Sequence, residues 1–96
     1  MEGLRRFDIA VHAGVAMVVV ESDLLPPDPA VMVIPLLEAY PAIPHLNPVI
    51  AFEGKDLVLA TRLMASVRRA ALKRAGSAAE QGDTISRAID VVMAGV

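Results

Sequence analysis

Few side chains in this sequence have the type and spacing that catalysis requires. Glu21 and Asp23 stand two positions apart and could share one face of a strand, where paired carboxylates can exchange protons with a substrate. The simpler interpretation is that they form the polar end of a strand. Ser22 and Ser66 lack the glycines that flank the nucleophile of a hydrolase, and no glycine-rich loop could hold a phosphate group. We therefore expect a binding protein with no catalytic residues.

Metal and redox chemistry find no support in the sequence. The sequence has two histidines, His12 and His45. Neither has another histidine or a cysteine at the spacing that is typical of a metal site. Each is more simply a surface or locally hydrogen-bonded residue. The sequence contains no cysteine, which excludes disulfide and thiolate chemistry and fits a cytoplasmic protein. We expect neither a metal nor another cofactor.

Cations are concentrated in one part of the chain. Between Leu57 and Ala79 there is no acid, but there are five cations, namely Arg62, Arg68, Arg69, Lys73 and Arg74. This run predicts either a solvated basic face or a docking patch for an acidic peptide or nucleic acid. No aromatic residue lies among these charges, so stacking on nucleic-acid bases is not expected.

The composition predicts one domain, spanning residues 1–96, with an aliphatic core. Hydrophobic residues make up 55% of the chain and aromatic residues 3%. A small domain cannot hide so much apolar surface by itself, so we expect a buried homodimer interface. The apolar run from Ala13 to Val20 is far too short to span a membrane, and Asp8, His12 and Glu21 argue against a signal peptide.

The first half of the chain reads as strands and proline-rich loops. Phe7–Val11 and Val15–Glu21 are β-branched and apolar, and the Gly-containing segment 12–14 between them predicts a hairpin. The prolines of segment 26–29 require a loop. Residues Val31–Ile34 then predict a short strand that Pro35 ends, and segment 40–47 predicts an irregular connection.

The second half combines a hairpin with helical patterns. Val49–Phe52 and Leu57–Ala60 flank a turn at 53–56. Residues Thr61–Ala75 are mostly good helix formers, so local propensity predicts a helix there. A further helix begins near Asp83 or Thr84, either of which could cap it, and ends at Ala94. Its apolar stripe comprises Ile85, Ala88, Ile89, Val92 and Met93.

That helix runs directly into the apolar sequence Ala94-Gly95-Val96. Most domains finish in polar, frayed residues. We therefore expect these residues either to dock against the body of the protein or to serve as a contact point. A glycine just past the last turn is also explained by helix capping alone.

Four segments, taken in order, resemble the CcdB family of toxins from bacterial toxin–antitoxin modules. They are 18–25 (VVVESDLL), 31–36 (VMVIPL), 46–49 (LNPV) continuing to 60–67 (ATRLMASV), and 88–96 (AIDVVMAGV). Phe7 also matches the opening strand of the family. The resemblance implies a mainly β fold, a small SH3-like barrel of the MazF and CcdB type with a C-terminal helix, paired into a homodimer. It also implies that Met64–Val67 continues the sheet, and it leaves residues 68–82 open.

The resemblance implies an activity without catalysis. CcdB toxins bind the A subunit of DNA gyrase, a topoisomerase, and trap the enzyme on cleaved DNA. The residues implied to contact gyrase are Ser22, Leu24, Leu25, Asp90, Met93, Ala94, Gly95 and Val96. The best-known members end in Trp-Gly-Ile. Here Ala94 replaces the tryptophan, and Asp90 and Met93 replace Asn and Phe.

The implied partners are a second copy, gyrase and a cognate antitoxin with a disordered tail. The basic run could steer that tail, with Arg62, Arg68 and Arg69 as its contacts. One alternative is a CcdB-fold protein that binds an antitoxin but has lost or changed its target. Another is a ribonuclease like MazF, in which Glu21 or Asp23 would act with Arg62.

Overall fold

Two-residue turns connect the strands of both hairpins in the computed structural model, which describes residues 3–94. Ala13-Gly14 joins β1 (Asp8–His12) to β2 (Val15–Val19), and Glu53-Gly54 joins β4 (Val49–Phe52) to β5 (Lys55–Leu59). The φ angles of all four turn residues lie between 51° and 79°, a backbone that matches the twist of the flanking strands. Both predicted hairpins are confirmed. Their turns are shorter than predicted, because His12 and Lys55 extend the strands.

The central strand is β3 (Ala30–Leu37), which is longer than predicted. The prediction that Pro35 ends this strand was wrong. One edge of β3 pairs with β2, and the other pairs first with β6 (Ala65–Arg68) and then with β5. Pro35 lies where the neighbour changes, and its carbonyl accepts a hydrogen bond from the Ala60 amide at 3.0 Å. The missing N–H of proline therefore removes no bond between strands.

The segment from residue 61 to residue 77 is not the helix that local propensity predicted. It forms a short 3₁₀ turn η1 (Thr61–Leu63), strand β6, a second turn η2 (Arg69–Ala71) and strand β7 (Lys73–Ser77). Strand β6 confirms for residues 65–67 the expectation that the CcdB resemblance gave for Met64–Val67, and Met64 lies just before the strand, at the end of η1. Pairing with β3 and β1 outweighs the helix preference of the alanines, leucines and cations, because propensity is a weak term beside tertiary contacts.

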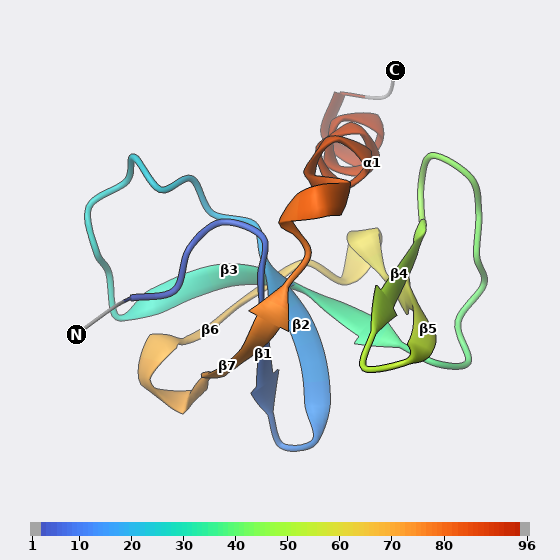
Figure 1. Ribbon diagram of the computed structural model, residues 1–96. Coiled ribbons are helices and arrows are strands. Elements are labelled where there is room, and N and C mark those ends of the chain that lie inside the picture. The colour runs from blue at the N-terminus through green and yellow to red at the C-terminus, as the bar shows by residue number, and fades with distance from the viewer. Residues whose placement is uncertain (1–2, 95–96) are drawn as a thin grey trace.

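The strands form a curled half-barrel, and the one α-helix of residues 3–94 stands at one end of it (Figure 1). The strand order is β4-β5-β3-β2-β1-β7, with β6 on the remaining edge of β3. The hairpin tip of β1 and β2 points away from the helix, toward the opposite end of the sheet. The predicted mainly β fold with a C-terminal helix is confirmed.

The helix α1 (Gly82–Ala94) follows a 3₁₀ turn, η3 (Ala79–Gln81), and covers one face of the sheet. The helix begins at Gly82, close to the predicted start. Asp83 and Thr84 therefore lie inside its first turn, and neither is the capping residue that was predicted. A Cβ atom on Gly82 would lie 2.7 Å from the Phe7 ring, so only glycine permits this approach. In the part of the chain described here, no helix is long and apolar enough to cross a membrane.

Two apolar clusters lie on opposite faces of the sheet. Ile85 and Ala88 of α1 are fully buried against a cluster that includes Ile9, Val18 and Ile34. The second cluster, on the inner side of the half-barrel, contains Met17, Val19, Val31 and Val33, and the half-buried residues Leu4, Val67 and Leu72 pack against it. The alternation of side chains along β2 and β3 supplies both clusters.

Candidate functional site

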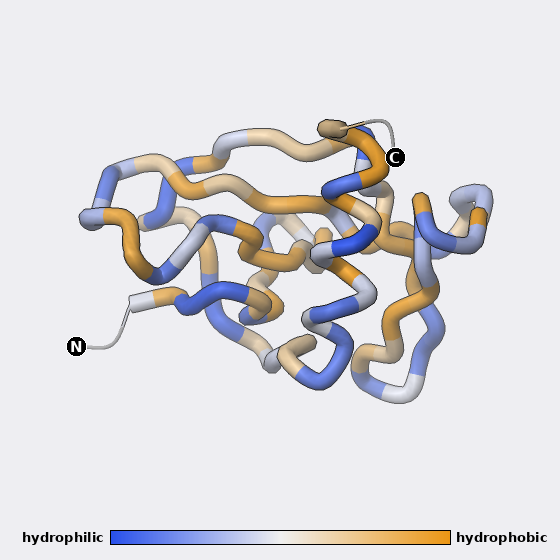
Figure 2. The backbone as a smooth tube through the Cα atoms, turned by 90° about the horizontal axis from the view of Figure 1, so that it is seen from above, coloured by the Kyte–Doolittle hydropathy of each residue, from blue (hydrophilic) through white to orange (hydrophobic). Residues whose placement is uncertain are grey.

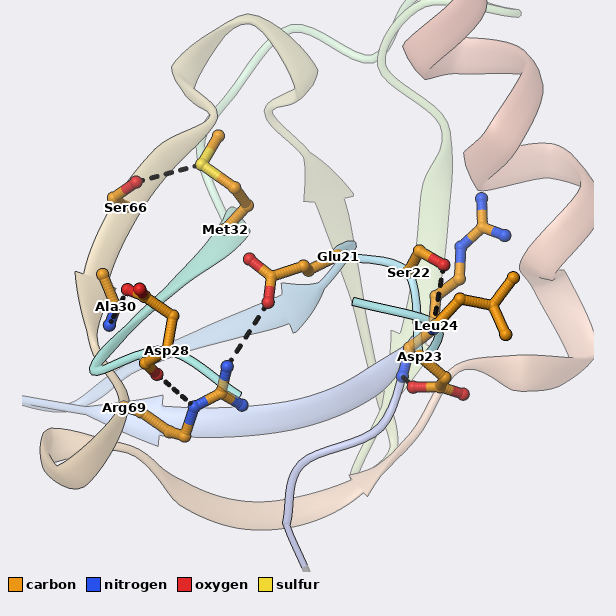
Figure 3. Close-up of polar contacts among 10 residues, drawn as sticks. Glu21, Ser22, Asp23, Leu24, Asp28, Ala30, Met32, Ser66 and Arg69 are labelled. Carbon is orange, nitrogen blue, oxygen red and sulfur yellow. Dashed lines mark hydrogen bonds and ion pairs between the residues drawn. The ribbon is translucent and has the colours of Figure 1, made fainter. Parts of the chain in front are cut away.

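The loop that follows β2 presents two leucines to solvent. The backbone amide of Leu24 donates a hydrogen bond of 3.1 Å to the hydroxyl oxygen of Ser22 (Figure 3). The Leu25 amide donates one of 3.2 Å to the Ser22 carbonyl. These bonds fix a tight turn. Leu24 is 93% exposed and Leu25 is 56% exposed. Adjacent exposed leucines on a fixed turn are typical of a surface that binds another protein.

Arg6 ties this loop to α1. Its backbone amide donates to a carboxylate oxygen of Asp23 at 2.8 Å, and its guanidinium Nη2 donates to the hydroxyl oxygen of Ser86 at 3.2 Å. The guanidinium also lies over the Phe7 ring, 4.7 Å from the ring centre. Arg6 therefore contacts the loop and the helix at the same time. Sequence analysis missed this role, because a single arginine before a strand carries no signal of a contact 80 positions away.

The exposed face of α1 continues the surface that begins at this loop. Ser86, Asp90 and Met93 follow the i, i+4, i+7 spacing of one helix face, and Ala94 lies beside them. Asp90 and Ala94 are exposed, and Met93 is 73% exposed, although it belongs to the predicted apolar stripe. Figure 2 shows the apolar last turn of α1 in orange. Gly95 and Val96, two of the predicted contact residues, lie outside the described residues.

These contacts bring six of the predicted contact residues onto one surface. We define the contact surface as the loop residues Ser22, Leu24 and Leu25 together with Asp90, Met93 and Ala94 of α1. The loop meets the helix near Ser86 through Arg6. Met93 is seven residues further along, which corresponds to about 10 Å of helix. The contact surface is therefore elongated and follows α1.

The predicted strand Val15–Glu21 is shorter in the structure, because β2 ends at Val19. Glu21 and Asp23 lie in the loop after it, so they neither share a strand face nor form the polar end of the strand. The Glu21 carboxylate is 3.3 Å from Nη2 of Arg69, and both side chains are largely buried (Figure 3). The Asp23 carboxylate accepts the hydrogen bond from Arg6. The cation that Glu21 meets is therefore Arg69 and not Arg62, the partner required by the ribonuclease hypothesis.

The cations of the basic run have different surroundings. Arg69 is engaged internally: its Nε donates to the Asp28 carbonyl at 2.8 Å, and its guanidinium pairs with Glu21. Arg62 in η1 and Arg68 at the end of β6 are exposed. Arg74 pairs with the buried Asp8 at 3.2 Å. Arg62 and Arg68 are thus the predicted contacts whose charges face solvent.

Within residues 3–94, neither histidine lies in a cluster of side chains that could bind a metal ion. His12 is exposed at the end of β1, and His45 lines a shallow hollow beside α1 with Arg87, Asp90 and Val91. Within residues 3–94, no group of three or more His, Cys, Asp or Glu residues is arranged to hold a metal ion.

Comparison with known protein families gives one match over nearly the whole chain. The family model described as "CcdB protein" matches residues 9–95 of the 96. The chain belongs to the CcdB family. A search of the curated proteins found no match. The matched region of this CcdB protein includes the loop leucines and the described part of α1. Arg6, which joins them, lies before it.

Membership of the CcdB family makes this protein a CcdB-type toxin, and the family acts as a poison and not as a catalytic enzyme. The elongated contact surface is consistent with such a mode of action. It offers exposed apolar side chains on a fixed backbone, whereas Glu21 and Asp23 are both engaged in hydrogen bonds or ion pairs within the chain.

Proposed function

We propose that this CcdB protein binds the A subunit of DNA gyrase and traps the enzyme on cleaved DNA. The observation that carries the proposal is the attachment of the Leu24 loop to α1 through Arg6, which joins two sets of predicted contact residues in one surface. Membership of the CcdB family supports gyrase as the target.

Binding at this surface would rest on burial of apolar side chains. Leu24 and Met93 are the most exposed large hydrophobic residues in the described part of the chain, at 93% and 73%. Fully burying such a side chain contributes about 1.5–3 kcal/mol. The turn bonds of Ser22 and the contacts of Arg6 hold the loop before the target arrives, which reduces the entropy lost on binding. No covalent bond changes in this mode of inhibition.

The experiment that tests this function is a gyrase cleavage assay with the wild type and two matched variants. Leu24→Asp places a charge on the most exposed large hydrophobic side chain of the contact surface and should abolish trapping of cleaved DNA. Val15→Asp makes the same kind of change at the hairpin tip, at the opposite end of the sheet from α1, and should leave trapping unchanged. Equal trapping by Leu24→Asp and the wild type would contradict the proposal.

The second candidate function is a CcdB-fold toxin whose target is not gyrase. The substitution that favours it is Ala94, which stands where the best-known members carry tryptophan. A large aromatic anchor often dominates the energy of an interface, and this chain lacks it. Growth arrest on expression, with no cleaved DNA trapped in the gyrase assay, would support this alternative.

We also propose that the protein forms a homodimer in the cytoplasm and is neutralised by an antitoxin with a disordered segment. Exposed apolar residues such as Ile43, Val49 and Leu63 provide surface for a second copy. Arg62 and Arg68 carry the charge that would steer an acidic segment, and Arg69 holds the loop behind them.

A further inference from the structure

Met93 is a largely exposed methionine within the contact surface. It is 73% exposed and lies in the last turn of α1, three residues after Asp90 and next to Ala94. Hydroperoxides oxidise the thioether of methionine to a sulfoxide, and the oxidant must reach the sulfur directly. The sequence contains no cysteine that could compete for the oxidant. Met93 therefore offers an accessible, oxidisable sulfur on the surface that carries the proposed target contacts.

The other methionines of residues 3–94 are shielded. Met17 in β2 is 7% exposed and belongs to the apolar cluster on the inner side of the half-barrel. Met64 is half-buried and packs against the cluster that contains Ile85 of α1. Met32 is also half-buried, and its sulfur accepts a hydrogen bond of 3.0 Å from the Ser66 hydroxyl, which occupies a sulfur lone pair (Figure 3). Within the described chain, the fold thus leaves one methionine open to an oxidant.

The oxidation of Met93 balances with hydrogen peroxide as the only co-reactant. A lone pair of Sδ attacks one peroxide oxygen, so that an S–O bond forms while the O–O bond breaks. The transferred hydroxyl gives its proton to the departing hydroxide, which leaves as water. The sulfur loses two electrons to the peroxide and becomes a sulfoxide.

The sulfoxide would change the contact surface and leave the core intact. Met93 belongs to neither apolar cluster, so a new oxygen on its side chain disturbs no packing inside the protein. On the surface, the same oxygen replaces an apolar group by a polar, chiral one. Burying that oxygen against an apolar partner costs free energy unless the partner supplies a hydrogen-bond donor. Oxidation should therefore weaken binding without unfolding the protein.

We propose that Met93 is a modification site for hydroperoxides, and that its oxidation to the sulfoxide lowers the affinity of the contact surface for its target. Reduction of the sulfoxide by a methionine sulfoxide reductase would restore the affinity. The effect on gyrase rests on the proposed function, whereas the selective oxidation follows from the exposure of Met93 alone. The best-known CcdB toxins carry phenylalanine at this position, which has no sulfur, so the proposed site is absent from them.

The first measurement compares the oxidation rates of the methionines in the full chain. After treatment with hydrogen peroxide, digestion with trypsin places Met93 in peptide 88–96 and Met64 in peptide 63–68, and mass spectrometry quantifies each sulfoxide. Met93 should be oxidised at least about threefold faster than Met64, because its sulfur is more accessible. The two rates should become equal in concentrated urea, where the fold protects neither. Equal rates in the folded protein would overturn the proposal.

The second measurement tests the effect on binding, with Met93→Leu as the matched control. Leucine keeps the apolar contact and has no sulfur, so the untreated variant should bind the gyrase A subunit within about threefold of the wild type. After treatment and removal of the peroxide, the wild type should bind at least about tenfold more weakly and Met93→Leu should be unchanged. The melting temperatures of both should stay the same. An equal loss in both proteins, or full affinity of a wild type oxidised at Met93, would contradict the proposal.

Hydrophobic-interaction chromatography separates this inference from the proposed function, because it measures the apolar surface without gyrase. The oxidised wild type should elute earlier than the untreated protein, and the elution of Met93→Leu should not change. If the untreated wild type does not bind gyrase but shows this shift, gyrase is rejected as the target and Met93 is retained as the modification site. Unchanged elution of a wild type oxidised at Met93 would overturn the effect on the contact surface.

Discussion

The Nη2 atom of Arg6 lies 3.2 Å from the hydroxyl oxygen of Ser86, which joins two residues 80 positions apart. An exposed hydrogen bond of this kind contributes only about 1 kcal/mol to stability. Its importance lies in geometry, because Arg6 also binds Asp23 through its backbone amide. The loop that carries Leu24 and the helix that carries Met93 are thereby held in a fixed relation.

Arg6→Ala should weaken binding to the gyrase A subunit by about threefold to tenfold, because the loop loses its link to α1 and must be ordered during binding. The melting temperature should change little, since the side chain is exposed. Arg5→Ala, which removes the neighbouring exposed guanidinium, is the matched control. Calorimetric titration would measure both affinities, and wild-type affinity for Arg6→Ala would rule out the positioning role.

Gly82→Ala should lower the free energy of unfolding by about 1–3 kcal/mol. Alanine normally stabilises a helix, but here its Cβ would lie 2.7 Å from the Phe7 ring, which Arg6 covers on one side. Urea unfolding measures the change. Gly3→Ala is the control, because no atom lies within 4 Å of its Cβ position. Increased stability of Gly82→Ala would contradict the close approach of Phe7.

Arg69→Ala should lower the free energy of unfolding by about 1–2 kcal/mol, because it leaves Glu21 and the Asp28 carbonyl without their donor. Arg68→Ala, one residue earlier in sequence, should change it by less than about 0.5 kcal/mol. Chemical denaturation distinguishes the two variants. Equal values would mean that Arg69 contributes no more than an exposed arginine.

Ala94→Trp should increase trapping of cleaved DNA by more than about tenfold, because it restores an aromatic anchor at the end of the contact surface. Any activity of the wild type should be lost on deletion of Gly95 and Val96. The gyrase cleavage assay compares the three proteins over a range of concentrations. Trapping by the wild type as strong as that by Ala94→Trp would show that the tryptophan is not required.

If the protein is a homodimer, its melting temperature should rise with protein concentration, because dissociation accompanies unfolding. Scanning calorimetry over a wide concentration range measures this dependence, and sedimentation equilibrium measures the mass directly. A monomer at micromolar concentration with a constant melting temperature would refute the homodimer.

Local sequence patterns predicted the two hairpins because their signals are local: β-branched runs separated by glycine turns whose φ angles are positive. Local patterns predicted the wrong conformation for Thr61–Ala75. The conformation of that segment is decided by pairing with β3 and β1, which lie far away in sequence. The resemblance to CcdB corrected Met64–Val67, since a family pattern carries tertiary information that propensity lacks.

The candidate site was predictable to a similar degree. The loop leucines and the residues of α1 were identified from the resemblance, and the structure connects them through Arg6. The different environments of Arg68 and Arg69 could not be foreseen, because adjacent arginines are equivalent in sequence. Only the position of the loop at 26–29 brings the Asp28 carbonyl to Arg69.

The packing of Ile9 from β1 in one apolar cluster with Ile85 and Ala88 from α1 has a consequence for synthesis on the ribosome. A nascent chain can form the hairpin of β1 and β2 early, but its outer apolar face stays uncovered until α1 has been made. Strand β3 likewise waits for β5 and β6. The protein therefore completes its core only after α1 has been synthesised, so no product that stops before α1 should have a stable fold or the activity of a toxin.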